Sequence, residues 1–249
     1  GYEEAAGQGL LAGLNAARAV SGAEPVGVDR AEGYLGVMVD DLTTLGTAEP
    51  YRMFTSRAEY RLLLRADNAD LRLTRKAIAA GCVGRQRQDH FSAKSKALNE
   101  ARAAYGGFKV TPPELAAKGV HVNQDGVRRS TLELLALPGM SVSRLRELFP
   151  DLPTVRPDVA EQLEIEGRYT GYIERQTADI HAFRKDEALV LPASLDFGLV
   201  GGLSNEVRLK LQAARPATLG AAARIPGITP AALTALLRHV RRKDLAQTA

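Results

Sequence analysis

The sequence predicts a mainly helical protein, and two observations lead to that prediction. Residues 1–20 place Glu3 and Glu4 in a first helical turn and Leu10 and Leu14 on one apolar stripe, which is typical of an amphipathic helix. From residue 159 almost to the end, apolar residues recur at the helical period. Most of the chain is therefore expected to be helical.

The first half of the chain is expected to alternate loops and helices. A loop with Gly and Pro follows the first helix, and residues 34–46 form a short apolar segment with a turn at Gly46. A helix-rich stretch starts at about residue 56, where Ser56 and Glu59 have the spacing of a capping box, although "YRLLLR" leaves a strand possible. Residues 89–105 are expected to form a polar helix.

The second half is expected to be helical with breaks at prolines. Thr111 and the two prolines after it open a short helix, and the helical stretch 130–150 is interrupted at Pro138 and Gly139. A long helix covers residues 158–188, with a buried side formed by Val159, Leu163, Tyr172, Ile173 and Ile180. Three short helices then form a small bundle, and they begin at Ser204, Thr218 and Thr229.

Length and composition are those of an ordinary water-soluble protein. The 249 residues allow one large or two modest domains, and 45% apolar residues are ample for a core. No apolar run approaches the roughly 20 residues that cross a bilayer, so a cytoplasmic protein without membrane contact is expected. One cysteine, Cys82, excludes an internal disulfide, and the four histidines are too far apart for a metal site.

Positive charge is concentrated between residues 51 and 90. That window holds nine basic and four acidic residues, a net charge of +5, whereas the whole chain carries +4. This local excess favours a polyanionic partner. Arg57, Arg61 and Arg65 are four residues apart, a spacing that places side chains on one face of a helix or a strand. For any single arginine, internal pairing is an equally good interpretation, with these acids as partners: Asp40, Asp41, Glu59, Asp67 and Asp70.

Two segments repeat a Pro-Gly turn before a helix. "LPGMSVSRLRELF" at residue 137 and "IPGITPAALTALL" at residue 225 share Pro-Gly, a hydrophobic residue, a polar cap and a leucine-bearing helix. The second resembles the hairpin of helix-hairpin-helix nucleic-acid modules, in which backbone amides reach a phosphate. The simpler interpretation, that each turn only starts a helix, is favoured.

Five longer blocks carry a resemblance to a known family. They are "GYEEAAGQGLLAGLNAA", "YLGVMVDDLTTLGTAEPYRMFTSRAEYRLLLRADNADLRLT", "RYTGYIERQ", "LPASLDFGLVGGLSNEVRLKL" and "RPATLGAAARIPGITPAALTALL". Together they closely resemble the C-terminal part of the tRNA uridine 5-carboxymethylaminomethyl modification enzyme family, also called glucose-inhibited division protein A. The resemblance is densest in residues 34–74 and 191–237.

The resemblance implies a particular domain organisation. In the family, a flavin-binding Rossmann-type α/β domain with a glycine-rich phosphate loop precedes this region, so the chain is expected to be a C-terminal fragment that lacks the loop. Residues 1–50 would be the last helix and tail of that truncated domain. Residues 51–155 would form a helical domain with a basic arginine face, and residues 156–249 a C-terminal bundle for partner and tRNA contact.

The resemblance also implies an activity for the full-length enzyme. Members use FAD, reduced by NADH, and methylene-tetrahydrofolate, together with a tRNA-modifying GTPase, to add a (carboxymethyl)aminomethyl group to C5 of the wobble uridine of tRNA. A homodimer, and a heterotetramer with the GTPase, are implied for the full-length form. The family's catalytic cysteines lie outside this region, and Cys82 stands where members usually have an apolar residue. We therefore expect Cys82 to be structural, no residue here to be catalytic, and the fragment alone to be inactive.

Three sets of residues match functional positions of the family. The flavin-facing start of the first helix is matched by Gly1, Tyr2, Glu3, Glu4 and Gln8. Arginine suits tRNA phosphates because its planar fork binds them through two hydrogen bonds. The tRNA-contacting positions are matched by Arg52, Arg57, Arg61, Arg65, Asn68 and Arg72. The partner-docking positions are matched by Ser204, Asn205, Glu206, Lys210, Arg215 and Gly227.

Two other interpretations stay open. One is a stand-alone helical RNA- or protein-binding module without flavin chemistry, although such a module would have no reason to start on "GYEEAAGQG". The weaker one is a complete flavoenzyme subunit, against which the missing phosphate loop argues strongly.

Overall fold

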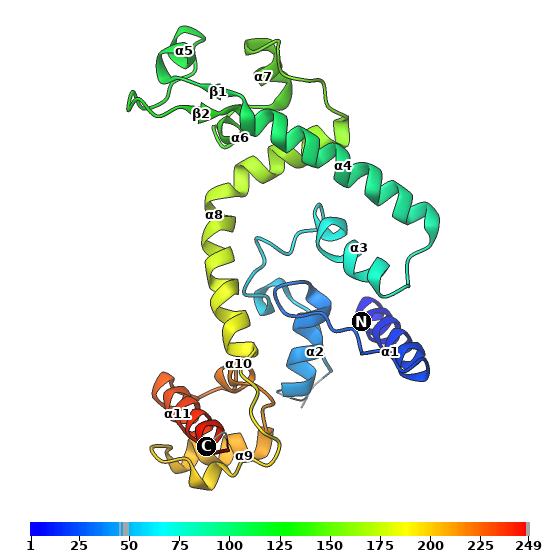
Figure 1. The fold of residues 1–249 in the computed structure, drawn as a ribbon, viewed down its shortest axis with the longest axis vertical. Helices are drawn as coiled ribbons and strands as arrows, with labels where there is room; N and C mark the ends of the chain where they lie inside the picture. The colour runs from blue at the N-terminus through cyan, green and yellow to red at the C-terminus, as the bar shows by residue number, and fades with distance from the viewer. Residues whose placement is uncertain (45, 47–49, 248–249) are drawn as a thin grey trace. The chain divides into compact units, whose positions relative to one another are not determined.

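The computed structural model describes residues 1–44, 46 and 50–247. These residues are mainly helical, as the sequence predicts (Figure 1). None of the helices in the described ranges is both long enough and apolar enough to span a lipid bilayer.

The chain forms two compact units, here called unit 1 and unit 2. Unit 1 consists of Gly1–Arg61 and Gln176–Ala249, and unit 2 consists of Leu62–Arg175. The sequence suggests domain boundaries after residues 50 and 155, and these remain a prediction. The boundaries between the two compact units fall after Arg61 and Arg175.

Unit 1 is built from helices at both ends of the chain. Its elements are α1 (Tyr2–Val20), α2 (Tyr34–Thr44), the 3-10 helix η1 (Thr55–Arg57), the last part of α8 (Pro157–Glu187), the 3-10 helix η2 (Phe197–Leu199), α9 (Asn205–Ala214), α10 (Leu219–Ala223) and α11 (Pro230–Gln247). The helix predicted for residues 1–20 is confirmed by α1, with Glu3 and Glu4 in its first turn. The long helix predicted for residues 158–188 is confirmed by α8.

A buried arginine joins three segments of unit 1. The Arg30 side chain is only 6% exposed and donates to Asp40 at 2.9 Å, Asp41 at 2.6 Å and Glu59 at 2.7 Å. It also donates to the backbone carbonyls of Val37 and Arg57. We call Arg30 and its three carboxylate partners the Arg30 cluster. Burial lowers the pKa of Arg30, but the hydrogen bonds and charges of its partners raise it by more, so that the pKa lies above its ordinary value.

The C-terminal helices of unit 1 close around their own apolar core. Leu211 and Leu236 are fully buried there beside Phe197. The predicted caps are confirmed: Ser204 accepts from the Val207 amide, Thr218 from the Ala221 amide and Thr229 from the Ala232 amide. Each hydroxyl thus satisfies an amide that a helix start leaves without a partner.

Unit 2 combines helices with one small hairpin. Its elements are α3 (Ala69–Ala79), α4 (Arg85–Gly107), β1 (Lys109–Val110), α5 (Pro112–Ala117), β2 (Arg129–Ser130), α6 (Thr131–Leu134), α7 (Val142–Leu148) and the first part of α8. β1 and β2 pair antiparallel, with Lys109 opposite Ser130. The capping box at Thr111 and Glu114 confirms the predicted short helix.

The core of unit 2 lies between α4, α6, α7 and α8. Tyr105 is fully buried in it and donates its hydroxyl to the Pro153 carbonyl at 3.1 Å. Helix α8 approaches α6 closely at Gly167, where a Cβ atom would lie 2.5 Å from Leu135 Cβ. Val159 and Leu163 of α8 are buried as predicted.

The prediction that Tyr172 lies on the buried side of α8 is wrong. Its side chain is 58% exposed, and the Arg175 guanidinium lies 5.9 Å from the centre of its ring. Ile180 is buried at 6% exposure, and Ile173 is half-buried. Tyr172 therefore lies outside the buried stripe of α8, and the Arg175 guanidinium lies over its ring instead.

Residues 56–68, all of which the structure describes, do not form the helix or strand that the sequence suggests from residue 56. Only η1 is helical there, and residues 58–68 form turns up to the start of α3. Arg65 donates to the Leu62 carbonyl and Asn68 to the Leu63 carbonyl, so side chains occupy acceptors that a helix would use. The four-residue spacing of the arginines therefore does not place them on one face of a helix or a strand.

Both Pro-Gly segments form tight turns. Gly139 and Gly227 have φ of 75° and 88°, values that glycine adopts without steric cost. The amide of the residue after each glycine donates back across its turn, Met140 to Leu137 at 3.2 Å and Ile228 to Ile225 at 3.1 Å. A capped helix follows each turn, which agrees with the simpler interpretation.

Candidate nucleic-acid interface

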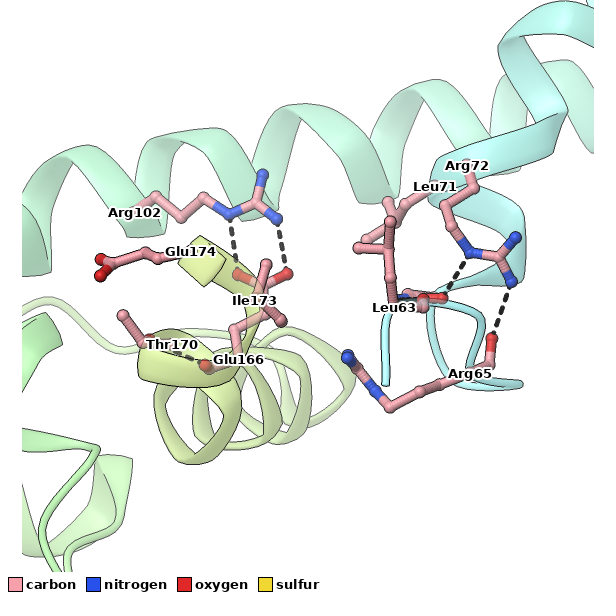
Figure 2. A pocket seen from close by; sticks show the side chains of 10 residues that line it. Leu63, Arg65, Leu71, Arg72, Arg102, Glu166, Thr170, Ile173 and Glu174 are labelled. Atoms are coloured by element: carbon pink, nitrogen blue, oxygen red, sulfur yellow. Dashed lines mark hydrogen bonds and ion pairs between the residues drawn. The ribbon is translucent and has the colours of Figure 1, made fainter. Parts of the chain in front are cut away.

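Three of the residues predicted to contact tRNA come together in unit 2. Asn68 is buried in the turn before α3 and donates to the Leu63 carbonyl at 2.9 Å. Its side-chain oxygen accepts from Arg72 Nε at 2.8 Å, and Arg72 Nη2 donates to the Arg65 carbonyl at 3.0 Å (Figure 2). Asn68 and the turn thus fix the direction of the Arg72 side chain.

The other walls of this site come from α4 and α8. Arg102 on α4 binds Glu166 on α8 through two hydrogen bonds, Nε to Oε2 at 3.0 Å and Nη2 to Oε1 at 2.5 Å (Figure 2). Together these elements border an open cavity of about 350 Å³. We call it the arginine pocket, and it is lined by Leu63, Arg65, Asn68, Leu71, Arg72, Arg102, Glu166, Thr170, Ile173 and Glu174.

A continuous polar network stabilises the pocket walls. Arg65 binds both oxygens of Asp67 at 2.9 Å, and its guanidinium lies 4.7 Å from the centre of the Tyr169 ring. The buried amide of Gln162 donates to Asp67 and to Glu166, each at 3.3 Å. Burial raises the pKa of Asp67, but Arg65 and Gln162 lower it by more, so the pKa lies below its ordinary value. The network links the Arg65 wall to the Arg102 wall.

Sequence reasoning missed most of the residues on α4 and α8. Glu166, Thr170 and Glu174 are four residues apart, so that helical spacing places them on one face of α8. This spacing is the signal that could have identified them together. Nothing in the local sequence links them to Arg102, which is 64 positions from its partner Glu166.

The other three predicted arginines belong to unit 1 and are exposed. Arg57 lies 4.9 Å from the centre of the Tyr51 ring and 3.5 Å from Asp41, and 40% of its side chain is exposed. Arg52 lies 5.2 Å from the centre of the Phe54 ring. Arg61 is exposed as well. These cations therefore remain accessible to an external anion.

Two of the five residues matched to a flavin site, Glu3 and Glu4, border a second cavity. Glu4 accepts from the Met53 amide at 3.0 Å, and Gln8 lies 3.7 Å from the Met38 sulfur. The hydrogen bond from Met53, with others from the start of α1, lowers the pKa of Glu4 to about 2. Glu3, Glu4 and five apolar or aromatic neighbours border a cavity of about 310 Å³, whereas Tyr2 is 94% exposed.

The residues matched to partner docking divide into two groups. Lys210 donates to Glu206 at 2.7 Å and to the Pro226 carbonyl at 2.9 Å, and a Cβ atom on Gly227 would collide with its amine. Ser204 instead caps α9, and the Asn205 side chain accepts from Arg208. The end of α9 is marked by Arg215, whose φ is 41°.

The C-terminal segment as a whole is basic. Residues 188–249 hold eight basic and three acidic residues, a net charge of +5.

Two family models match the chain. The C-terminal helical domain of the tRNA modifying enzyme MnmG/GidA matches residues 85–177, and the C-terminal helical bundle of the same enzyme matches residues 179–249.

Curated relatives and solved structures extend this similarity to nearly the whole chain. The chain is 49% identical to the tRNA uridine 5-carboxymethylaminomethyl modification enzymes MnmG of Granulibacter bethesdensis and Geobacter metallireducens, over 98% and 94% of its length. It spans 39% and 38% of those relatives. A crystal structure of Aquifex aeolicus GidA is similar with a TM-score of 0.80 and 39% identity, over 96% of this chain and 38% of that one.

The fold, the matched domains and the identity along the chain point to the same enzyme. They confirm the resemblance seen in the sequence, including the mainly helical architecture. The chain therefore belongs to the MnmG/GidA family of tRNA modifying enzymes, whose two C-terminal helical domains it carries.

Proposed function

We propose that this chain supplies the tRNA-binding part of an enzyme that modifies C5 of the wobble uridine of tRNA. The main support is the convergence of Arg65, Asn68 and Arg72 with Arg102 around one open pocket. The exposed arginines of residues 51–61 and the net charge of +5 in residues 51–90 add to it, because a polyanion is attracted by a concentrated positive charge.

The first helix fits a partial contact with FAD, the cofactor that the family implies. The first amides of a helix have no partner within it and favour an electron-rich group, so the start of α1 can face the pyrimidine edge of a flavin. The bordering cavity of about 310 Å³ is at the lower end for ligand sites. FAD reduced by NADH would supply the electrons, and methylene-tetrahydrofolate the carbon, while Gly1 to Gln8 would only position the ring.

The tRNA proposal is tested by salt-dependent binding. The chain is titrated with an unmodified tRNA that carries a wobble uridine, over a range of salt concentrations. Replacing Arg57 and Arg61 by Ala should weaken binding and reduce the slope of log K against log salt by about one unit for each lost phosphate contact. Arg156→Ala is the matched control, because Arg156 is equally exposed and pairs with Asp158 in unit 2. An unchanged slope in the double variant would contradict the proposal.

We also propose that the basic C-terminal bundle binds the GTPase partner. Lys210, Glu206 and Gly227 form one surface group there, and Leu209 on the same helix is 67% exposed. Exposed apolar residues beside charged ones are common at protein interfaces. Immobilised GTPase should retain the chain, and Leu209→Asp should reduce retention severalfold. Equal retention of the variant and the parent chain would refute docking at this surface.

A further inference from the structure

We infer that the arginine pocket binds one unpaired nucleobase of the RNA, and not a phosphate group. This inference rests on the proposed function and names the part of the RNA that the pocket takes. The first support is electrostatic. The lining holds three arginines against Glu166 and Glu174, and Asp67 pairs with Arg65 behind it. The site is thus close to neutral overall, which suits an uncharged ring.

The second support is that oxygen atoms of the protein already accept several N–H groups of Arg65 and Arg102. Arg102 directs Nε and Nη2 to Glu166 and Nη1 to Asn99. Arg65 directs Nε and Nη2 to Asp67 and Nη1 to the Leu62 carbonyl. A phosphate needs N–H edges, whereas a base stacks on the flat face of a guanidinium. Three of the five N–H groups of each of these guanidinium groups are thus engaged, and the face of Arg102, whose side chain is 37% exposed, is open to stacking.

The third support is the apolar part of the lining. Leu63, Leu71 and Ile173 lie among the polar residues, and Figure 2 shows Ile173 between the α8 wall and the turn before α3. A cavity of about 350 Å³ has room for one ring system. A base inside a duplex is stacked on both faces and cannot enter, so the ligand is a base that has left its stack.

Glu174 provides the acceptor for the base. Glu174 is exposed and lines the pocket, and its side chain has no hydrogen-bond partner among the residues that the structure describes. A carboxylate accepts only, so it selects ring or amino N–H groups on the base edge. Gln162 already joins Asp67 to Glu166, and Glu166 binds Arg102. Because the opposite walls are thus connected, binding requires little ordering of the protein.

The test compares a single-stranded RNA with its duplex. A fluorescein-labelled octanucleotide, alone or annealed to its complement, is titrated with the whole chain by fluorescence anisotropy. Thr170→Trp fills the pocket from an exposed position of α8 and should weaken single-strand binding about tenfold, the scale of one lost base stack. Duplex binding should stay unchanged. Tyr172→Trp, two positions along the same helix and exposed, is the matched control and should change neither affinity.

A second variant tests the acceptor without adding bulk. Glu174→Gln keeps the side-chain shape but replaces the charged acceptor by a neutral one, and it should weaken single-strand binding about fivefold, the difference between a hydrogen bond to a charged group and one to a neutral group. Equal wild-type affinity for strand and duplex would overturn the inference, as would single-strand binding that is unchanged in Thr170→Trp. If tRNA binds but Thr170→Trp has no effect, the inference fails and the proposed function stands. If the octanucleotide binds through the pocket but tRNA is not preferred, the proposed function fails instead.

Discussion

The Arg30 cluster and the arginine pocket both contain arginine–carboxylate pairs, but they leave different surfaces open. The Arg30 side chain is 6% exposed, and three carboxylates and two backbone carbonyls receive its N–H groups. The Arg102 side chain is 37% exposed, and its pair with Glu166 borders a cavity of about 350 Å³. The first arrangement closes on itself, whereas the second forms the wall of a binding site.

The comparison teaches that the number of arginines does not locate an RNA-binding surface. Five acids were expected to neutralise the predicted arginines, and one of them, Asp67, does pair with Arg65. Asp40, Asp41 and Glu59 instead pair mainly with Arg30. Because Arg30 binds these acids, Arg57 is the only one of the three exposed arginines predicted in unit 1 for which the described residues show a contact with one of them, at 3.5 Å. Pairing in the buried cluster therefore helps to keep the exposed cations accessible.

Arg30→Met should have the largest effect on stability. The substitution removes the arginine that lies 2.6 Å from Asp41, whose side chain is only 9% exposed, and leaves it Arg57 at 3.5 Å. Removing one partner of a buried ion pair costs about 3–5 kcal/mol. Asp40 keeps its pair with Arg224, so we expect the lower end of that range. Urea unfolding followed by circular dichroism measures the difference in the free energy of unfolding. A loss below about 1 kcal/mol would show that the cluster is not a stabilising centre.

Arg102→Met is the contrasting variant in the same measurement. Arg102 and Glu166 are partly exposed, at 37% and 25%, so water hydrates the carboxylate that remains. We expect a loss of at most about 1 kcal/mol. A loss as large as that of Arg30→Met would remove the distinction between the closed cluster and the open pocket.

The sequence predicts the elements of both regions better than their tertiary contacts. Caps such as Ser204 and Thr229, and the first-turn acids of α1, depend on neighbours within four positions and were found. The turn from 58 to 68 was missed because side chains, including Asn68, take the backbone acceptors of a helix.

The contacts of the candidate sites depend on distant residues. Arg65, Asn68 and Arg72 were identified through the family resemblance, but their pocket also requires Arg102 and Glu166. These two residues meet only because α4 packs beside α8 in the folded chain, a contact that no local pattern records. The sequence therefore reveals one wall of the pocket and not the cavity.

Asp67→Asn should have the smallest effect, a small loss of stability near neutral pH that disappears in acid. Arg65 and Gln162 hold the pKa of Asp67 below its ordinary value of 3.8, although burial raises it. A carboxylate with a lowered folded-state pKa stabilises the fold fully above its unfolded-state pKa, and this contribution disappears as the pH falls through the folded-state pKa. The free energy of unfolding of the wild-type chain should therefore fall more steeply than that of Asp67→Asn below about pH 4. Between pH 6 and 8 the two curves should run parallel.

Urea unfolding at a series of pH values between 2 and 8 measures the free energy of unfolding of both chains, and the other acids titrate alike in both. Parallel curves down to pH 2 would mean that the Arg65 wall does not depend on its ion pair with Asp67.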